Sequence, residues 1–118
     1  MSDLESIRRF EYRPFRMRIG FDVDFEAGDE TFHGLCRDVS DAGIRVEFDG
    51  SVVVGIGGLL ILRHPTGVLK LEARVAYIEK CQVGLLFLFT SQWERELTIE
   101  FIASIANHTG NSQVICFP

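Results

Sequence analysis

Strict alternation of apolar and polar residues over positions 15–26 is the feature that most limits the folds open to this chain of 118 residues. The apolar side chains at every second position are Phe15, Met17, Ile19, Phe21, Val23 and Phe25. Because successive side chains of a β-strand point to opposite faces of its sheet, a period of two predicts a strand with one buried and one solvated face. Turn residues at 27–30 follow directly and predict a hairpin, with 31–39 as the returning strand.

Further strand candidates, separated by turn residues, continue through the middle of the chain. They cover 44–48, 59–62, 68–79 and 81–89. Together with the first two they make six strands in succession, joined mostly by short turns. Such a succession favours an all-β fold, either an antiparallel barrel or a strongly curled sheet.

The period changes at Ser91, where a helix is expected. Ser91 and Glu94 have the spacing of a capping box, in which both side chains satisfy free amide donors at a helix start. The apolar residues that then recur every four positions are Trp93, Leu97, Phe101 and Ile105. We therefore expect a helix over 91–107 with an apolar stripe on the barrel. The tail 108–118 docks either on the core or on a partner.

Size and composition indicate one folded domain. The chain is long enough to bury a core, and its 47% hydrophobic and 25% charged residues are typical of an ordinary folded protein. Cys36, Cys81 and Cys116 match no metal-ligand spacing, so a reducing cytoplasm is the expected location. The start lacks the pattern of a signal peptide, and the apolar runs are too short to span a bilayer, so no membrane insertion is expected.

Patterns typical of enzymes and metal sites are missing from the sequence. His33, His64 and His108 are scattered, without acidic companions in a metal-binding pattern. There is no nucleophile elbow, no Walker loop and no Cys/His nucleophile arrangement. The glycines at 55–58 precede a strand and carry no lysine, so they predict a tight bend rather than a phosphate loop. We expect neither catalysis nor a metal.

Positive charge is concentrated near the N-terminus. The net charge of −5 argues against general attraction to DNA, RNA or an anionic membrane. Yet five arginines lie within the first twenty residues: Arg8, Arg9, Arg13, Arg16 and Arg18. The first three precede the first strand, and a guanidinium fork suits phosphate oxygens and the O6/N7 edge of guanine. A solvated basic arm, paired with Glu5 and Glu11, explains the same residues equally well.

A second polar group closes the turn after 31–39, where the chain reads Asp38-x-Ser40-x-x-Gly43. A carboxylate and a hydroxyl two residues apart can point the same way from a strand end and accept the N1 and N2 hydrogens of a guanine. Gly43 would allow the backbone geometry that this requires. An ordinary Asx-type turn uses the same residues.

Both groups, in this order on an all-strand background, resemble the signatures of the PilZ domain family of bacterial receptors for cyclic di-GMP, a second messenger. The signatures are R-x-x-x-R and [D/N]-x-S-x-x-G, which stand here as Arg9 to Arg13 and Asp38 to Gly43. The resemblance implies a flexible arm over 1–7, followed by a PilZ-like domain over 8–107. Its fold would be a six-stranded antiparallel barrel of the split-barrel type with a C-terminal helix.

The resemblance also implies a ligand and its contacts. The implied ligand-binding residues are Arg8, Arg9, Arg13, Asp38, Ser40 and Gly43. The two signature arginines would contact guanine edges and phosphates, Asp38 and Ser40 would contact a guanine, and Gly43 would shape the turn. In this family an arginine at the position of Arg8 tends to accompany an intercalated pair of cyclic di-GMP molecules.

The expected function is that of a receptor in which cyclic di-GMP orders the N-terminal arm and so creates or hides a surface for an effector protein. The main alternative is an interaction module that keeps the fold without binding nucleotide. An enzyme acting on a nucleotide is a third class, supported by charge alone. Arg16 and Arg18 either extend the ligand site or balance nearby acids, and contacts from His33, Arg37 or Arg45 stay open.

Overall fold

The computed structural model describes residues 15–17, 20–109 and 114–116, and side chains within 20–107. The strands are β1 (Phe15–Met17), β2 (Asp22–Ala27), β3 (Glu30–Val39), β4 (Gly43–Phe48), β5 (Gly57–His64), β6 (Gly67–Glu79), β7 (Gln82–Phe87) and β8 (Val114–Cys116), and the helix is α2 (Gln92–Thr109).

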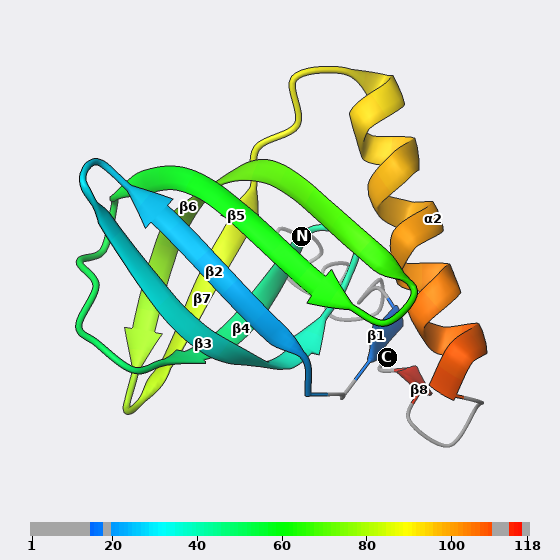
Figure 1. Cartoon of the computed structure of the whole chain (residues 1–118), viewed down its shortest axis with the longest axis horizontal. Helices are drawn as coiled ribbons and strands as arrows, with labels where there is room; N and C mark the ends of the chain where they lie inside the picture. The colour runs from blue at the N-terminus through cyan, green and yellow to red at the C-terminus, as the bar shows by residue number, and fades with distance from the viewer. Residues whose placement is uncertain (1–14, 18–19, 110–113, 117–118) are drawn as a thin grey trace, which may run out of the picture.

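Six antiparallel strands close into a barrel (Figure 1). Their order is β2-β5-β6-β7-β4-β3, and the additional pairing of β2 with β3 closes the ring. β1 continues the sheet beyond β3, and β8 pairs with β1. The predicted all-β fold, a six-stranded antiparallel barrel with a C-terminal helix, is confirmed.

The prediction of one unbroken strand over 15–26 is wrong. Met17 of β1 pairs with Val39, whereas Asp22 of β2 pairs with Leu35. The register against β3 therefore shifts by one residue between β1 and β2. The two halves also have different second neighbours, because β1 pairs with β8 and β2 pairs with β5. The alternation of side chains nevertheless continues into β2, where Val23 and Phe25 are fully buried.

The β2–β3 hairpin forms where it was predicted. Its turn is Gly28-Asp29, and Gly28 has a φ of +65°, a conformation that glycine adopts without a steric penalty. A glycine at the first of two turn positions suits a hairpin turn that matches the strand twist. The core inside the barrel draws on every strand from β2 to β7 and includes Val23, Phe25, Cys36, Val46, Leu60, Leu62, Leu71, Ala73, Val75 and Leu85.

The start of α2 follows the predicted capping pattern with one change. Ser91 Oγ accepts the amide hydrogen of Glu94 at 3.1 Å. The Glu94 carboxylate reaches one residue further back than expected and accepts the amide hydrogen of Thr90 at 2.7 Å. Both side chains therefore satisfy amide donors at the helix start, as a capping box requires.

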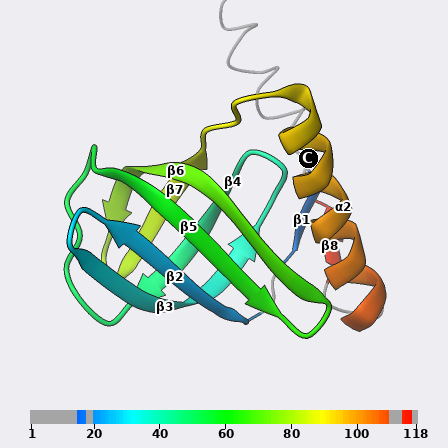
Figure 2. The same cartoon turned by 45° about the horizontal axis from the view of Figure 1, so that its top comes forward.

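The helix lies against one end of the barrel, next to β1 and β8 (Figures 1 and 2). Its buried residues are Thr98, Phe101, Ile102 and Ile105. Trp93 was predicted to join this stripe, but it is 69% exposed, so that prediction is wrong. The reason is geometric: a repeat of four residues drifts by about 40° per step around a helix of 3.6 residues per turn, and Trp93 is three steps from Ile105.

The C-terminal segment β8 forms an antiparallel pair with β1, in which Phe15 is opposite Cys116 and Met17 is opposite Val114. The tail was expected to dock on the core or on a partner. Residues 114–116 pair with the first strand of the same chain. Helices long and apolar enough to cross a membrane are not found among the described residues.

Candidate functional site

A surface pocket of about 220 Å³ lies where the turn between β3 and β4 meets β6 and β7. It is lined by Asp38, Ser40, Ala42, Gly43, Ile44, Arg45, Ala76, Tyr77, Gly84, Leu85 and Leu86. The pocket thus brings together all three residues of the predicted second motif. Apolar groups make up most of the wall, with a few polar groups at one side, which is the usual make-up of a small-molecule site.

A β-bulge in β3 aims Asp38 at this pocket. Cys36 pairs with Val46 and Asp38 pairs with Arg45, so two steps on β3 are matched by one on β4. A change of one residue in register moves a side chain to the other face of a sheet. Cys36 therefore points into the core, where it is fully buried, while Asp38 shares the outer face with Arg45 and lines the pocket.

Ser40 holds the turn in place with its own hydrogen bonds. Its amide donates to the carbonyl of Gly43 at 2.9 Å, and its Oγ accepts the amide hydrogen of Ala42 at 3.2 Å. This is a serine turn, in which the Ser40 hydroxyl takes the part that the Asp side chain would have in the Asx-type turn expected as the alternative. The same turn is tied to the helix, because Arg95 of α2 lies 3.5 Å from the Asp41 carboxylate.

Gly43 is required for a different reason from the one expected. Its φ is not in the left-handed region, which among the described glycines is occupied by Gly28, Gly55 and Gly67. Instead, β7 passes so close that a Cβ at Gly43 would lie 2.5 Å from the carbonyl oxygen of Leu85. The glycine permits the tight approach of β4 and β7 at the pocket wall.

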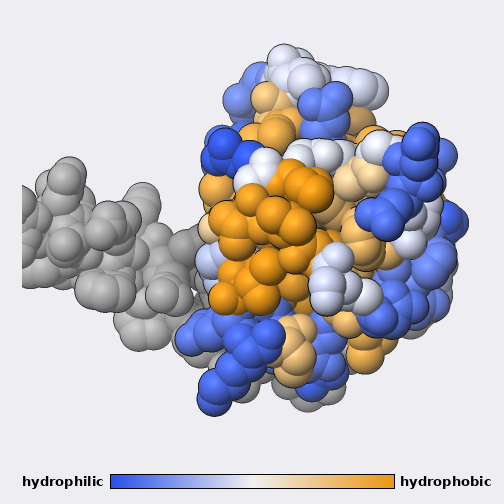
Figure 3. All heavy atoms as spheres, turned by 90° about the vertical axis from the view of Figure 1, so that its left-hand side faces the viewer, coloured by the Kyte–Doolittle hydropathy of each residue, from blue (hydrophilic) through white to orange (hydrophobic). Residues whose placement is uncertain are grey.

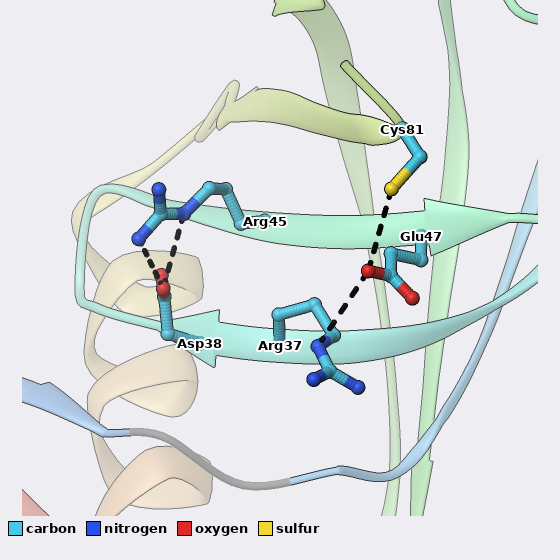
Figure 4. A network of polar contacts seen from close by, with 5 residues as sticks. All are labelled: Arg37, Asp38, Arg45, Glu47 and Cys81. Carbon is cyan, nitrogen blue, oxygen red and sulfur yellow. Dashed lines mark hydrogen bonds and ion pairs between the residues drawn. The ribbon is translucent and has the colours of Figure 1, made fainter. Parts of the chain in front are cut away.

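Arg45 is bound to Asp38 within the pocket (Figure 4). Asp38 Oδ2 accepts hydrogen bonds from Arg45 Nε at 3.0 Å and from Nη2 at 2.5 Å. The Asp38 side chain is 7% exposed and that of Arg45 is 30% exposed. The hydrogen bonds that Arg45 donates to Asp38 raise the pKa of Arg45. The charge of Asp38 and the fields of Tyr77 and Glu79 act in the same direction, whereas burial opposes them. The guanidinium therefore stays charged.

Tyr77 supplies an aromatic surface that the sequence analysis did not assign to the site. It is 43% exposed and pairs across the strands with Gly84, against which its ring is packed so closely that a Cβ there would overlap it. An exposed ring lying on a glycine offers a flat apolar shelf beside the charged pair. The signal that could have found it is a tyrosine on one predicted strand opposite a glycine on the next.

A family model described as the PilZ domain matches residues 7–104. The chain belongs to the PilZ domain family. This is a family of receptor domains for cyclic di-GMP. The matched region includes both predicted signatures, 9–13 and 38–43.

Solved PilZ structures share the fold of this chain at low sequence identity. The cyclic di-GMP-bound PilZ domain of YcgR from Escherichia coli is 16% identical with a TM-score of 0.71, covering 82% of this chain and 92% of its own. The PilZ domain of CeSA from a cellulose-synthesizing bacterium is 14% identical with a TM-score of 0.66, covering 76% and 96%. Bacillus subtilis MotI, an inhibitor of motility, is 20% identical with a TM-score of 0.62, covering 80% and 51%. No curated protein sequence matches the chain.

The first PilZ signature lies outside the described residues, and so do Arg8 and Arg18. Arg16 belongs to β1, but its side chain is not described. His33 and Arg37 do not line the pocket. Instead, the Arg37 side chain lies 4.0 Å from the Glu47 carboxylate, as Figure 4 shows.

A second polar cluster lies on β2, β3 and β5, with the Asp24 carboxylate at its centre. Asp24 Oδ1 is 2.6 Å from His33 Nδ1, and Oδ2 accepts a hydrogen bond from Arg63 Nε at 3.1 Å. Burial alone would raise the pKa of Asp24, but the hydrogen bonds and charges of His33 and Arg63 outweigh it and lower that pKa. Within the described part of the chain, no three His, Cys, Asp or Glu side chains gather in a way that could hold a metal ion.

Proposed function

We propose that this PilZ domain binds cyclic di-GMP with one guanine in the pocket beside the β3–β4 turn. The observation that carries the proposal is the convergence of Asp38, Ser40 and Gly43 on one pocket, next to the ring of Tyr77. Membership of the family and the intact R-x-x-x-R sequence add support.

The pocket chemistry suits a purine with adjacent N–H donors. An ionised carboxylate such as Asp38 accepts the N1 and N2 hydrogens of guanine, and the apolar wall accommodates the faces of the base. A volume of about 220 Å³ is smaller than a typical ligand site of roughly 300 to 1,000 Å³. One base therefore occupies the pocket, and Arg9 and Arg13 bind the phosphates and base edges outside it.

Arg8 extends this proposal to the number of ligands. A third guanidinium next to the signature pair offers another face for stacking and another fork for phosphate. We propose that the site takes an intercalated pair of cyclic di-GMP molecules, so that calorimetry gives two ligands per chain. Arg8→Ala should reduce this ratio to one.

The proposed output is a changed surface for an effector protein in the cytoplasm. The turn that carries Ser40 also carries Asp41, whose carboxylate meets Arg95 of α2. A ligand that moves this turn would act on the start of the helix, and one that orders the N-terminal arm would cover part of the barrel. The ligand is released chemically unchanged, because the proposed role is binding rather than catalysis.

Isothermal titration calorimetry with cyclic di-GMP at micromolar protein tests the proposal. We expect heat of binding for the wild type and a large loss of affinity for Arg13→Ala and for Asp38→Ala. Arg37→Ala is the matched control, because it removes an arginine that does not line the pocket. The absence of heat, or binding that Arg13→Ala leaves unchanged, would refute the proposal.

A second candidate is an interaction module that does not bind nucleotide, and the surface in Figure 3 favours it. Apolar residues gather on the end of the barrel that faces the viewer there. The loop between β4 and β5 contributes Val53 and Val54, which are 62% and 56% exposed. Exposed apolar patches of this kind often bind proteins. Pull-downs that recover the same partners with and without cyclic di-GMP, together with a flat titration, would favour this function.

A further inference from the structure

The polar groups of the pocket are already bound to one another. Asp38 accepts two hydrogen bonds from Arg45, and Ser40 Oγ accepts the amide hydrogen of Ala42. A guanine edge that is to use Asp38 therefore enters a site whose carboxylate is held by an internal cation.

The geometry makes Arg45 a direct competitor for Asp38. The two residues are opposite each other in the β3–β4 register, so their side chains share one face and one pocket. Both guanidinium donors go to the same oxygen, Oδ2, and the guanidinium is the more exposed partner. Charge-assisted hydrogen bonds of this kind are about twice as strong as neutral ones.

We propose that Arg45 is a built-in competitor that occupies Asp38 in the free protein and sets the affinity of the site for its nucleotide. The inference rests on the proposed function, since it concerns the guanine that Asp38 would bind. When the N1 and N2 hydrogens of the base take Oδ2, Arg45 turns away from Asp38. The apparent affinity is then the intrinsic affinity multiplied by the fraction of molecules in which Arg45 has released the carboxylate.

The surroundings of Arg45 allow this release. Its side chain is 30% exposed, so the guanidinium reaches solvent without crossing the core. The carboxylate of Glu79, at the end of β6, already contributes to the negative field around Arg45. The cation therefore keeps a favourable environment after it leaves Asp38.

Replacing Arg45 with a side chain of similar length and no charge tests the competition. We expect Arg45→Met to bind cyclic di-GMP more tightly than the wild type, by about fivefold to tenfold, since a partly exposed ion pair is worth on the order of 1 kcal/mol. Arg37→Met is the matched control: it removes the same charge from the neighbouring strand and leaves Asp38 and the pocket lining untouched. Its affinity should equal that of the wild type.

The outcomes separate this inference from the proposed function. A wild type that binds cyclic di-GMP while Arg45→Met binds equally or more weakly overturns the inference and leaves the function standing. Tighter binding by both methionine variants also overturns it, because an effect shared with Arg37→Met cannot come from the release of Asp38. A wild type that does not bind overturns the proposed function and the inference with it.

A measurement on the wild type covers the case in which Arg45→Met does not fold. The Nε–H group of Arg45 is hydrogen-bonded to Asp38, so its proton should exchange slowly with water in the free protein. At saturating cyclic di-GMP we expect its NMR signal to shift and its exchange with water to speed up at least fivefold. An unchanged exchange rate would mean that Arg45 stays on Asp38 in the complex, contrary to the proposal.

Discussion

Gly43→Ala is the substitution whose effect can be worked out most directly from the structure. A Cβ at this position would lie 2.5 Å from the carbonyl oxygen of Leu85. Comfortable contact between nonbonded heavy atoms begins at about 3.5 Å, so β4 and β7 would have to separate by about 1 Å. The overlapping oxygen belongs to the backbone of β7, so no side-chain rotation relieves the overlap.

The expected loss in the free energy of unfolding is about 1 to 3 kcal/mol, the usual range for overpacking a well-packed site. Urea unfolding followed by circular dichroism measures it. Gly50→Ala is the matched control, because its new Cβ would meet only the Phe32 ring, at 3.6 Å, and Gly50 is exposed. We expect this control to stay within about 0.5 kcal/mol of the wild type.

The result that would refute the reasoning is a Gly43→Ala protein as stable as the wild type. It would show that β4 and β7 are not held at the close spacing described. The demand for glycine at this position would then lie in the ligand complex. Equal destabilisation by Gly50→Ala would also count against the argument, because it would point to a general effect of alanine on strand ends.

Four other substitutions test the packing and electrostatics. Ser40→Ala removes the acceptor for the Ala42 amide and should lower the free energy of unfolding by about 1 kcal/mol, measured by urea unfolding. Ile105→Ala should lower it by about 2 to 5 kcal/mol, whereas Trp93→Ala should change it by less than about 0.5 kcal/mol, because only Ile105 is buried. The lowered pKa of Asp24 means that its charged form stabilises the fold above the unfolded-state pKa of about 4 and that this contribution is lost as pH falls through the folded-state pKa. The stability difference between wild type and Asp24→Asn should therefore shrink as pH falls below about 4, and a difference that does not decrease on acidification would contradict this.

The barrel could be predicted from sequence because its signals are local. Alternation with a period of two, turn residues and a capping box each act over a few neighbouring positions. The division of 15–26 could not be predicted in the same way. It depends on which strands pair with each half, and the choice between β8 and β5 as second neighbour is made by segments far along the chain.

For the candidate site too, only the features that a local sequence motif specifies could be predicted. The motif placed Asp38, Ser40 and Gly43 together, and the structure finds all three at one pocket. The sequence does not predict Arg45 as a pocket residue, because its pairing with Asp38 depends on the bulge at β3, and neither a glycine nor a proline marks that bulge in the sequence. The reason for a glycine at position 43 could not be predicted either, because the atom that a Cβ would overlap belongs to the backbone of β7 and not to the turn itself.

The most direct test of the central claim is an NMR titration of the isotope-labelled protein with cyclic di-GMP. If the nucleotide binds at the described pocket, amide shifts should concentrate on 38–45 of β3 and β4 and on 76–77 and 84–86 of β6 and β7. Residues 49–56, in the loop at the apolar end of the barrel, should change little. Shifts confined to that loop, or no shifts at saturating nucleotide, would contradict the account.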